Sequence, residues 1–170
     1  MDGLQRRECI LERLRTSSVP VRGALLAEEF AVSRQVIVND IALLRAQGSN
    51  IYATPQGYLM PTETLQNRKV TIACRHGAAE LEQELVAMVE EGAQVLDVIV
   101  EHPVYGEIKA NLMVNNLYDV RKLTEKLAQT KAEPLASVTG GVHLHTLIVS
   151  SDEQLERIKN KLRESSLLVE

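Results

Sequence analysis

Cysteine is scarce in this chain of 170 residues, which holds only Cys9 and Cys74. The two lie far apart and form no Cys-x-x-Cys pair, so the sequence predicts neither a disulfide framework nor a thiolate zinc site. A reducing cytoplasm fits this cysteine usage best. No apolar run approaches the ~20 residues that a membrane-spanning helix needs, so we expect a soluble protein, not secreted and with no membrane partner.

The motifs of several enzyme classes are missing as well. The chain has no phosphate-binding loop, no G-x-S-x-G elbow and no cysteine nucleophile beside a histidine. The net charge of −4 argues against a general nucleic-acid binder. Residues 1–60 nevertheless carry seven arginines against six acids, and every base among them is arginine. Arginine is the side chain suited to bidentate contacts with phosphate and guanine.

The first sixty residues show three amphipathic helices. Apolar residues recur at helical spacing over 6–14 and 21–30, and a third helix over 34–46 begins after Ser33, a favourable N-cap. Two short strands then flank a Pro-Gln-Gly turn at 55–57. Three short helices followed by a hairpin predict a winged helix-turn-helix domain over residues 1–61.

The start of the third helix carries the candidate DNA contacts. In a helix-turn-helix, the last helix enters the major groove with its N-terminal residues on base edges, and Arg, Gln and Asn have bidentate reach to guanine and adenine. A bundle fragment with a polar helix start is the alternative, and the hairpin argues against it. We assign phosphate contacts to Arg22 and Arg45. The predicted DNA-binding residues are Ser33, Arg34, Gln35, Val38, Asn39, Arg22 and Arg45.

A second domain is predicted over residues 66–170, after a polar boundary at 61–64. Strand and helix patterns follow in the order β-α-β-β-α-β, and a C-terminal helix follows with Asp152 as its expected cap. A short edge strand is expected at 167–169. This order predicts an α+β fold of the ferredoxin-like kind, a four-stranded antiparallel sheet with helices on one face.

Two histidines stand out in the last long strand. His143 and His145 are two residues apart, so their side chains point to one face and could share one cation. The competing interpretation is a pair of exposed histidines on a solvated sheet face. Elsewhere, His76 precedes a helix that carries acids. If His76 were helical, Glu80 would be its neighbour, whereas a His76 in a loop could meet either Glu80 or Glu84.

Three sequence blocks carry a family resemblance. They are Arg75-His76 before the acidic helix, the run EHPVYG at 101–106 and the run TGGVHLHT at 139–146. With the winged helix, these blocks resemble the niacin-responsive transcriptional repressors of the NiaR type, in which a helix-turn-helix domain precedes a three-histidine (3H) domain. The resemblance covers essentially the whole chain.

The resemblance implies a homodimeric repressor of NAD biosynthesis or niacin uptake genes, with operator DNA and nicotinic acid, its co-repressor, as partners. It implies that the 3H domain, residues 66–170, binds the effector, forms the dimer and carries a divalent metal site with one ion per chain. Nickel or zinc fits first, and iron or manganese next. The ligands that the resemblance implies are His76, Glu84, His143 and His145, so it selects Glu84 over Glu80.

The turn after the second strand of this domain supplies two more candidates. His102 and Tyr105 are predicted effector contacts, against the alternative of a rigid turn with a packed tyrosine.

Two other functions compete with the repressor. A metal-dependent small-molecule hydrolase is one, because three protein ligands and an open position also hold catalytic zinc. A structural metal in a protein-interaction module is the other. The sequence offers no further catalytic group, and an N-terminal winged helix has no purpose in a simple hydrolase.

Overall fold

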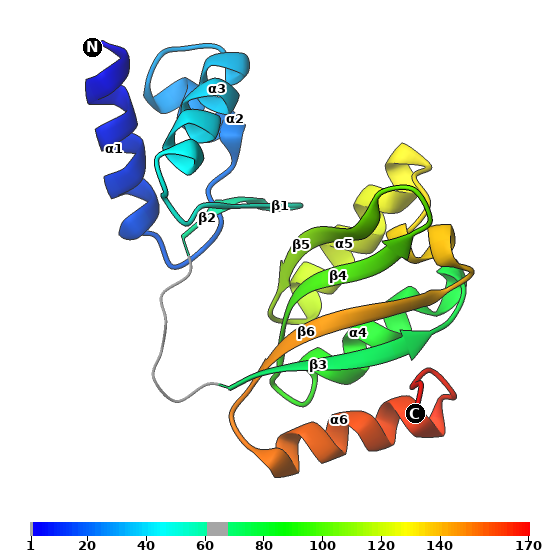
Figure 1. Cartoon of the computed structure of the whole chain (residues 1–170). Coiled ribbons are helices and arrows are strands. Elements are labelled where there is room, and N and C mark those ends of the chain that lie inside the picture. The colour runs from blue at the N-terminus through cyan, green and yellow to red at the C-terminus, as the bar shows by residue number, and fades with distance from the viewer. Residues whose placement is uncertain (1, 61–67) are drawn as a thin grey trace. The chain divides into compact units, whose positions relative to one another are not determined.

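The computed structural model of the protein describes residues 2–60 and 68–170 (Figure 1). The chain divides into two compact units, within residues 1–63 and 64–170, and each is described by itself. The predicted boundary at 61–64 falls outside the described residues. Among the helices of the described ranges, none combines the length and the apolar character that a membrane span requires.

The N-terminal unit consists of three helices and a hairpin, as the sequence predicts. Its elements are α1 (Gly3–Arg15), α2 (Gly23–Glu29), α3 (Arg34–Ala46), β1 (Tyr52–Thr54) and β2 (Gly57–Leu59). Helix α3 has the predicted bounds, and the Ser33 side chain caps it by accepting the Val36 N–H. One apolar core joins the elements. Its buried members are Ile10, Leu14, Val21, Leu26, Ala27, Ile37, Ile41, Leu44 and Ile51.

A buried carboxylate ties α1 to α3. Asp40, on α3, is 3% exposed, and its Oδ2 accepts a hydrogen bond from Arg6 Nε at 2.6 Å. Its Oδ1 accepts from Arg7 Nη1 at 3.3 Å. The two arginines supply the charge without which a buried carboxylate would be strongly disfavoured, and the bond to Asp40 raises the pKa of Arg6. The side chains of these two arginines therefore serve to hold α1 against α3.

The C-terminal unit contains one four-stranded sheet. Its strands are β3 (Arg68–Arg75), β4 (Gln94–His102), β5 (Gly106–Val114) and β6 (Val142–Val149). Its helices are α4 (Leu81–Val89), α5 (Leu117–Thr130) and α6 (Asp152–Glu164), with short 3-10 turns η1 (Ala78–Glu80) and η2 (Leu135–Thr139). The βαββαβ order with a C-terminal helix, the antiparallel pairing and the mixed fold class are as predicted.

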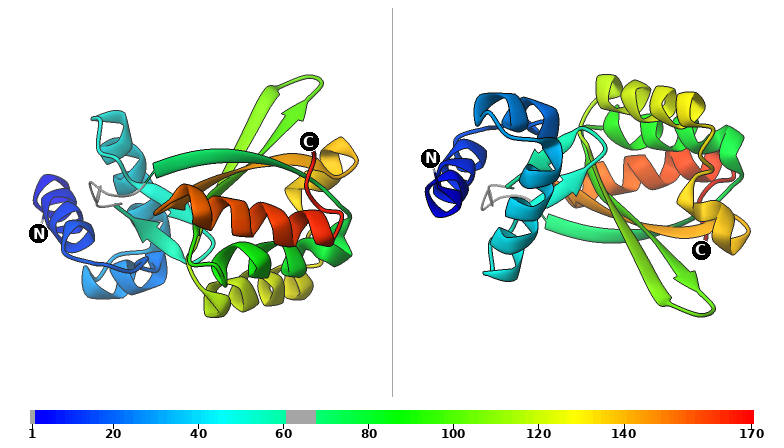
Figure 2. Two further views of the ribbon diagram at one scale, coloured as in Figure 1. Left: turned by 90° about the horizontal axis from the view of Figure 1, so that it is seen from below. Right: turned by 90° about the horizontal axis from the view of Figure 1, so that it is seen from above.

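The strands lie in the order β3-β6-β4-β5, with β6 and β4 in the centre. In ferredoxin itself the first and third strands are central, so the two sheets share the order along the chain but not the order in space. Helices α4, α5 and α6 all cover one face, and no helix in the described part of this unit covers the other (Figure 2). The core between helices and sheet includes Leu85, Met88, Val95, Leu147 and Ile158.

Two local predictions in the C-terminal unit are wrong. Ser151, not Asp152, caps α6, because Ser151 has extended backbone and its side chain accepts the Gln154 N–H at 3.1 Å. Asp152 is instead the first helical residue, where its charge suits the helix N-terminus. Residues 167–169 do not form a strand. They follow the outer edge of β3 through a single bridge, Leu168 to Cys74.

Neighbouring residues of α3 provide a test of the N-terminal core. Ile37 is fully buried, whereas Val38 is 39% exposed. We expect Ile37→Ala to lower the free energy of unfolding by about 2–5 kcal/mol, because it leaves a cavity. Val38→Ala should change it by less than about 0.5 kcal/mol. Urea denaturation followed by circular dichroism measures both, and equal effects would contradict the packing of α3.

Candidate metal centre

The paired histidines of β6 point into the protein. His143 and His145 are 2% and 1% exposed and lie on the face of the sheet that the helices cover. The interpretation of two exposed histidines on a solvated face is therefore wrong. Their rings are T-shaped to one another, with centroids 4.9 Å apart.

The acidic partner comes from the start of α4. After β3 the chain passes His76 and the turn η1 before α4 begins at Leu81, so His76 lies in a loop. Glu84, in the first turn of α4, is fully buried beneath the histidines, whereas Glu80 lies in η1 and is only half-buried. Glu84 is thus the glutamate that the structure places with His76.

All three histidines approach the Glu84 carboxylate with the same ring nitrogen, Nε2. Its Oε2 lies 2.7 Å from His76 Nε2 and 3.2 Å from His145 Nε2. Its Oε1 lies 3.0 Å from His143 Nε2. The ligand atoms of His76, Glu84 and His143 fall within 4.8 Å of one another, and His145 joins this group through Glu84.

The other ring nitrogen of each histidine is held by the backbone. His76 Nδ1 donates to the carbonyl of Gly77 at 2.7 Å, and His143 Nδ1 donates to that of Gly141 at 2.8 Å. His145 Nδ1 donates to the carbonyl of Asp97 at 2.6 Å. A carbonyl oxygen can only accept, so each Nδ1 carries the proton and each neutral ring presents a lone pair at Nε2.

These residues fit a divalent transition metal. Three imidazole lone pairs and a carboxylate converge, and they cannot satisfy one another without a cation among them. Within the described residues, His76 Nε2 is buried and forms no hydrogen bond of good geometry, although Glu84 Oε2 lies 2.7 Å away. Backbone carbonyls that orient metal-binding histidines through Nδ1 are a usual feature of such sites.

Charge coupling inside the cluster shifts its pKa values. Burial favours the neutral forms of His76 and His145, but the Glu84 carboxylate outweighs burial and raises the pKa of both. Burial also disfavours the Glu84 carboxylate, yet the three histidines hold the pKa of Glu84 well below its usual value. Burial and the nearby Glu84 raise the pKa of the Cys74 thiol, so Cys74 stays neutral.

Two residues that sequence reasoning missed position the histidines. Gly141 has a positive φ of 95° and accepts the His76 N–H, and a Cβ there would overlap the His76 carbonyl oxygen. Asp97 lies at a bulge in β4, and its carboxylate accepts the Thr146 N–H and pairs with Lys109. An acid inside an apolar strand was the available sequence signal for Asp97.

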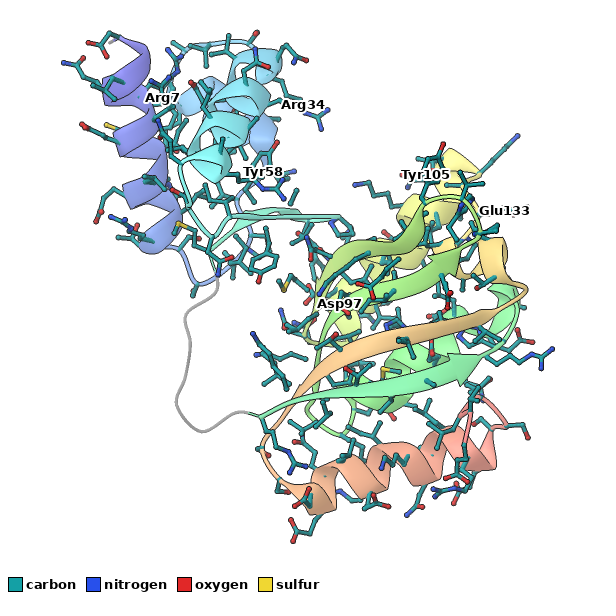
Figure 3. The ribbon with its side chains drawn as sticks, in the orientation of Figure 1. Arg7, Arg34, Tyr58, Asp97, Tyr105 and Glu133 are labelled. Atoms are coloured by element: carbon teal, nitrogen blue, oxygen red, sulfur yellow. The ribbon has the colours of Figure 1, made fainter. Side chains whose placement is uncertain are left out.

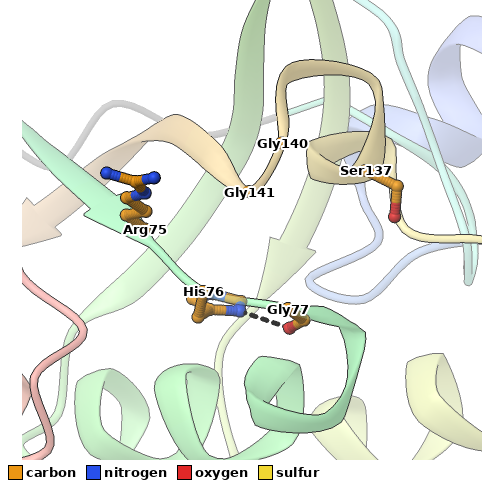
Figure 4. A pocket seen from close by; sticks show the side chains of 6 residues that line it. All are labelled: Arg75, His76, Gly77, Ser137, Gly140 and Gly141. Atoms are coloured by element: carbon orange, nitrogen blue, oxygen red, sulfur yellow. Dashed lines mark hydrogen bonds between the residues drawn. The ribbon is translucent and has the colours of Figure 1, made fainter.

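A pocket of about 420 Å³ opens beside the cluster (Figure 4). Its lining residues are Arg75, His76, Gly77, Ser137, Gly140 and Gly141. His76 thus belongs to both the pocket and the cluster, so a small molecule in the pocket would lie next to the metal ligands.

The predicted effector contacts lie elsewhere. His102 Nδ1 accepts the N–H groups of Val104 and Tyr105 and so fixes the β4–β5 turn. Tyr105 is 77% exposed at the hairpin tip (Figure 3) and is not the packed tyrosine of the alternative interpretation. Neither His102 nor Tyr105 is among the residues that line the pocket.

The predicted DNA contacts share the exposed side of the N-terminal unit's last helix. Arg34, Gln35, Val38 and Asn39 are exposed on α3, and Gln35 donates a hydrogen bond to Asn39. The Arg34 side chain points away from the unit (Figure 3). Ser33 serves as the cap of this helix. Arg22, the N-cap residue of α2, and Arg45, in the last turn of α3, are also exposed.

Comparison with known proteins agrees with both units. A family model of the HTH domain matches residues 6–59, and the 3H domain model matches residues 69–170. The chain is 43% identical over 166 residues to the probable transcription repressor NiaR of Thermotoga maritima. It is 39% identical over 170 residues to the transcription repressor NadR of Bacillus subtilis. Each match covers 98% of this chain and 94% of the relative.

A helix-turn-helix domain joined to a 3H domain defines a class of DNA-binding transcription repressors, which are regulators and not enzymes. The chain belongs to the NiaR-type family of these repressors. The hydrolase alternative is therefore not supported.

The close approach at Gly141 yields a test of the cluster. Gly141→Ala should weaken metal binding by about 10–100-fold, because it displaces both the His76 loop and the carbonyl that orients His143. Gly140→Ala is the matched control, since Gly140 also has a positive φ but has open space around it. Titration with Zn²⁺ or Ni²⁺ by calorimetry measures both affinities. Equal losses in the two variants would show that backbone strain alone is responsible.

The pKa shifts predict a pH dependence of the metal-free protein. A raised histidine pKa adds stability that is full below about pH 6.5 and is lost as the pH rises through the folded-state value. The lowered Glu84 pKa adds stability above its ordinary value of 4.5 that is lost as the pH falls. The melting temperature without metal should therefore fall as the pH rises above about 6.5. Bound metal should suppress this fall, and Glu84→Gln should flatten it.

Proposed function

We propose that this repressor controls genes of NAD biosynthesis or niacin uptake, and that nicotinic acid is its co-repressor. The effector would bind at or near one divalent metal ion held by His76, Glu84, His143 and His145. The observation that carries the proposal is the convergence of three Nε2 atoms on Glu84, each ring being oriented by a backbone carbonyl.

The donor set suits nickel or zinc, with iron or manganese as further candidates, because imidazole nitrogen dominates the set. A metal bound here with five or six ligands would act as a Lewis acid with open positions for a carboxylate or a pyridine nitrogen. Nicotinic acid carries both groups. The pocket beside His76 gives a flat ring of this size a place next to the cluster. His102 and Tyr105 stay predicted effector contacts that lie outside the pocket lining.

The DNA-binding role rests on the exposed polar start of α3. Arg34 and Gln35 would read base edges in the major groove, with Ser33, Val38 and Asn39 beside them. Arg22 and Arg45 would contact phosphate. Since Arg6 and Arg7 are committed to Asp40, one unit has few free cations, and a homodimer on two half-sites would double the footprint. A repressor of this kind acts in the cytoplasm.

The effector would act by favouring one arrangement of the two α3 helices, one from each copy in the dimer. His76 in a loop, Glu84 on α4 and the β6 histidines would be tied together by the bound metal and ligand. The shift in operator affinity cannot exceed the difference in nicotinate affinity between the two arrangements.

An operator-binding assay with matched variants tests the function. The DNA is a duplex selected from a random library by the metal-loaded protein, and nicotinate is compared with nicotinamide. Nicotinate should raise operator affinity by about 5–150-fold. His143→Ala should lose metal, nicotinate binding by calorimetry and this increase together. Arg34→Ala should lose about 1–3 kcal/mol of operator binding while retaining nicotinate.

One outcome would overturn the mechanism. If metal-free His143→Ala binds nicotinate as the wild type does and still gains operator affinity from it, the metal has a structural role only. An Arg34→Ala variant with unchanged operator affinity and sequence preference would remove α3 from base recognition.

A further inference from the structure

The pocket beside the metal centre has a cation of its own. Among the described residues that line it, only Arg75 carries a permanent charge. His76 also lines the pocket, but its Nε2 faces Glu84 and its Nδ1 donates to the carbonyl of Gly77. Neither ring nitrogen of His76 is therefore free to donate to a molecule in the pocket. Apart from the metal proposed above, an anion bound here has the Arg75 guanidinium as its counter-charge.

The Arg75 guanidinium has no acid of its own. In the same unit Arg68, Arg157 and Arg163 each form an ion pair with an aspartate or a glutamate. The side chain of Arg75 pairs with no acid and forms no hydrogen bond within residues 2–60 and 68–170. A guanidinium presents its N–H donors as a planar fork that matches the two oxygens of a carboxylate. Arg75 can thus take a carboxylate without first giving up a partner in this part of the chain.

The backbone of Arg75 is held on both sides. Arg75 ends β3 and pairs with Val142, the first residue of β6. Its N–H donates to the carbonyl of Leu167 at 2.9 Å. In the pocket the Arg75 side chain stands at one end of the wall that Gly140 and Gly141 form (Figure 4). Binding therefore has to order only the side chain, which limits the entropy lost.

The charges around the pocket give it a polarity. A Cβ on Gly77 would lie 3.2 Å from Glu80 Oε2, so the Glu80 carboxylate lies beside Gly77. Gly77 and Arg75 lie on opposite sides of His76 along the pocket (Figure 4). A carboxylate in the pocket would be repelled at the Gly77 side and attracted at the Arg75 side. The carboxylate end of a bound molecule is therefore expected at Arg75.

An arginine in this position can tell an acid from its amide. Nicotinate and nicotinamide share one flat ring, but the acid presents two acceptor oxygens and the amide presents one oxygen and an NH₂ donor. Because a guanidinium has only donors, an amide turned toward Arg75 would set N–H against N–H. A site that leaves buried polar groups unpaired with the wrong ligand discriminates strongly against that ligand.

We infer that Arg75 binds the carboxylate of the effector and so makes the repressor respond to nicotinate in preference to nicotinamide. The inference rests on the proposed function and names a specificity-determining residue of the same site. With the carboxylate at Arg75, the ring nitrogen is the group left for the side of the pocket where His76 joins the metal ligands.

Calorimetry of the full-length protein loaded with Zn²⁺ tests this role. Arg75→Met removes the charge but keeps much of the side-chain length, so nicotinate should bind about 10–100-fold more weakly. Nicotinamide, measured by its displacement of nicotinate, should keep its wild-type affinity. Arg75→Lys should recover part of the nicotinate affinity, because the charge returns without the fork. Arg121→Met is the matched control, at an exposed position of α5 outside the pocket lining, and should change neither affinity.

Three results would overturn the inference. The first is an Arg75→Met variant that binds nicotinate as the wild type does. The second is an equal loss of nicotinate and nicotinamide affinity, or no recovery in Arg75→Lys, because Arg75 would then only shape the pocket. The third is loss of Zn²⁺ from Arg75→Met, which would assign the effect to the metal ligands. All three leave nicotinate binding by the wild type intact, whereas a wild type that binds no nicotinate would overturn the proposed function itself.

Discussion

A carboxylate buried away from water needs positive charge beside it, and the 3H domain is arranged around one such group, Glu84. Three imidazoles surround it, and each is turned toward it by a backbone carbonyl on the far side of its ring. The charge can arrive as a proton or as a metal ion. The turn η1, the glycine at 141 and the bulge near Asp97 all serve to bring these groups together.

The two units meet the same electrostatic requirement in different ways. In the N-terminal unit the buried Asp40 receives its positive charge from Arg6 and Arg7, which are permanent cations of the chain itself. In the C-terminal unit the charge beside Glu84 depends on pH and on what is bound. The DNA-binding unit is thus complete without a ligand, whereas the 3H domain is the unit whose stability responds to its surroundings.

Much of the fold could be predicted from the sequence, because α3 with its Ser33 cap and the strands of the 3H domain have clear periodicity. The strand order could not, since periodicity identifies the faces of a strand but not its neighbours. Helix geometry alone favoured Glu80 as the partner of His76. The family resemblance selected Glu84 instead. The structure buries Glu84 beside His76, and it can do so because a 3-10 turn separates His76 from α4. The backbone carbonyls that orient the histidine rings could not be predicted either, because every residue has such a carbonyl whatever its side chain.

The positions of the cluster residues along the chain also have a consequence for folding during synthesis. Its members come from a loop, from α4 and from β6, so they are separated by long stretches of the chain. During synthesis, His76 and Glu84 leave the ribosome well before the two histidines of β6. A newly made chain therefore cannot bring this set of side chains together until β6 has been translated, so the cluster can form only after β3, α4, β4, β5 and α5 have been made.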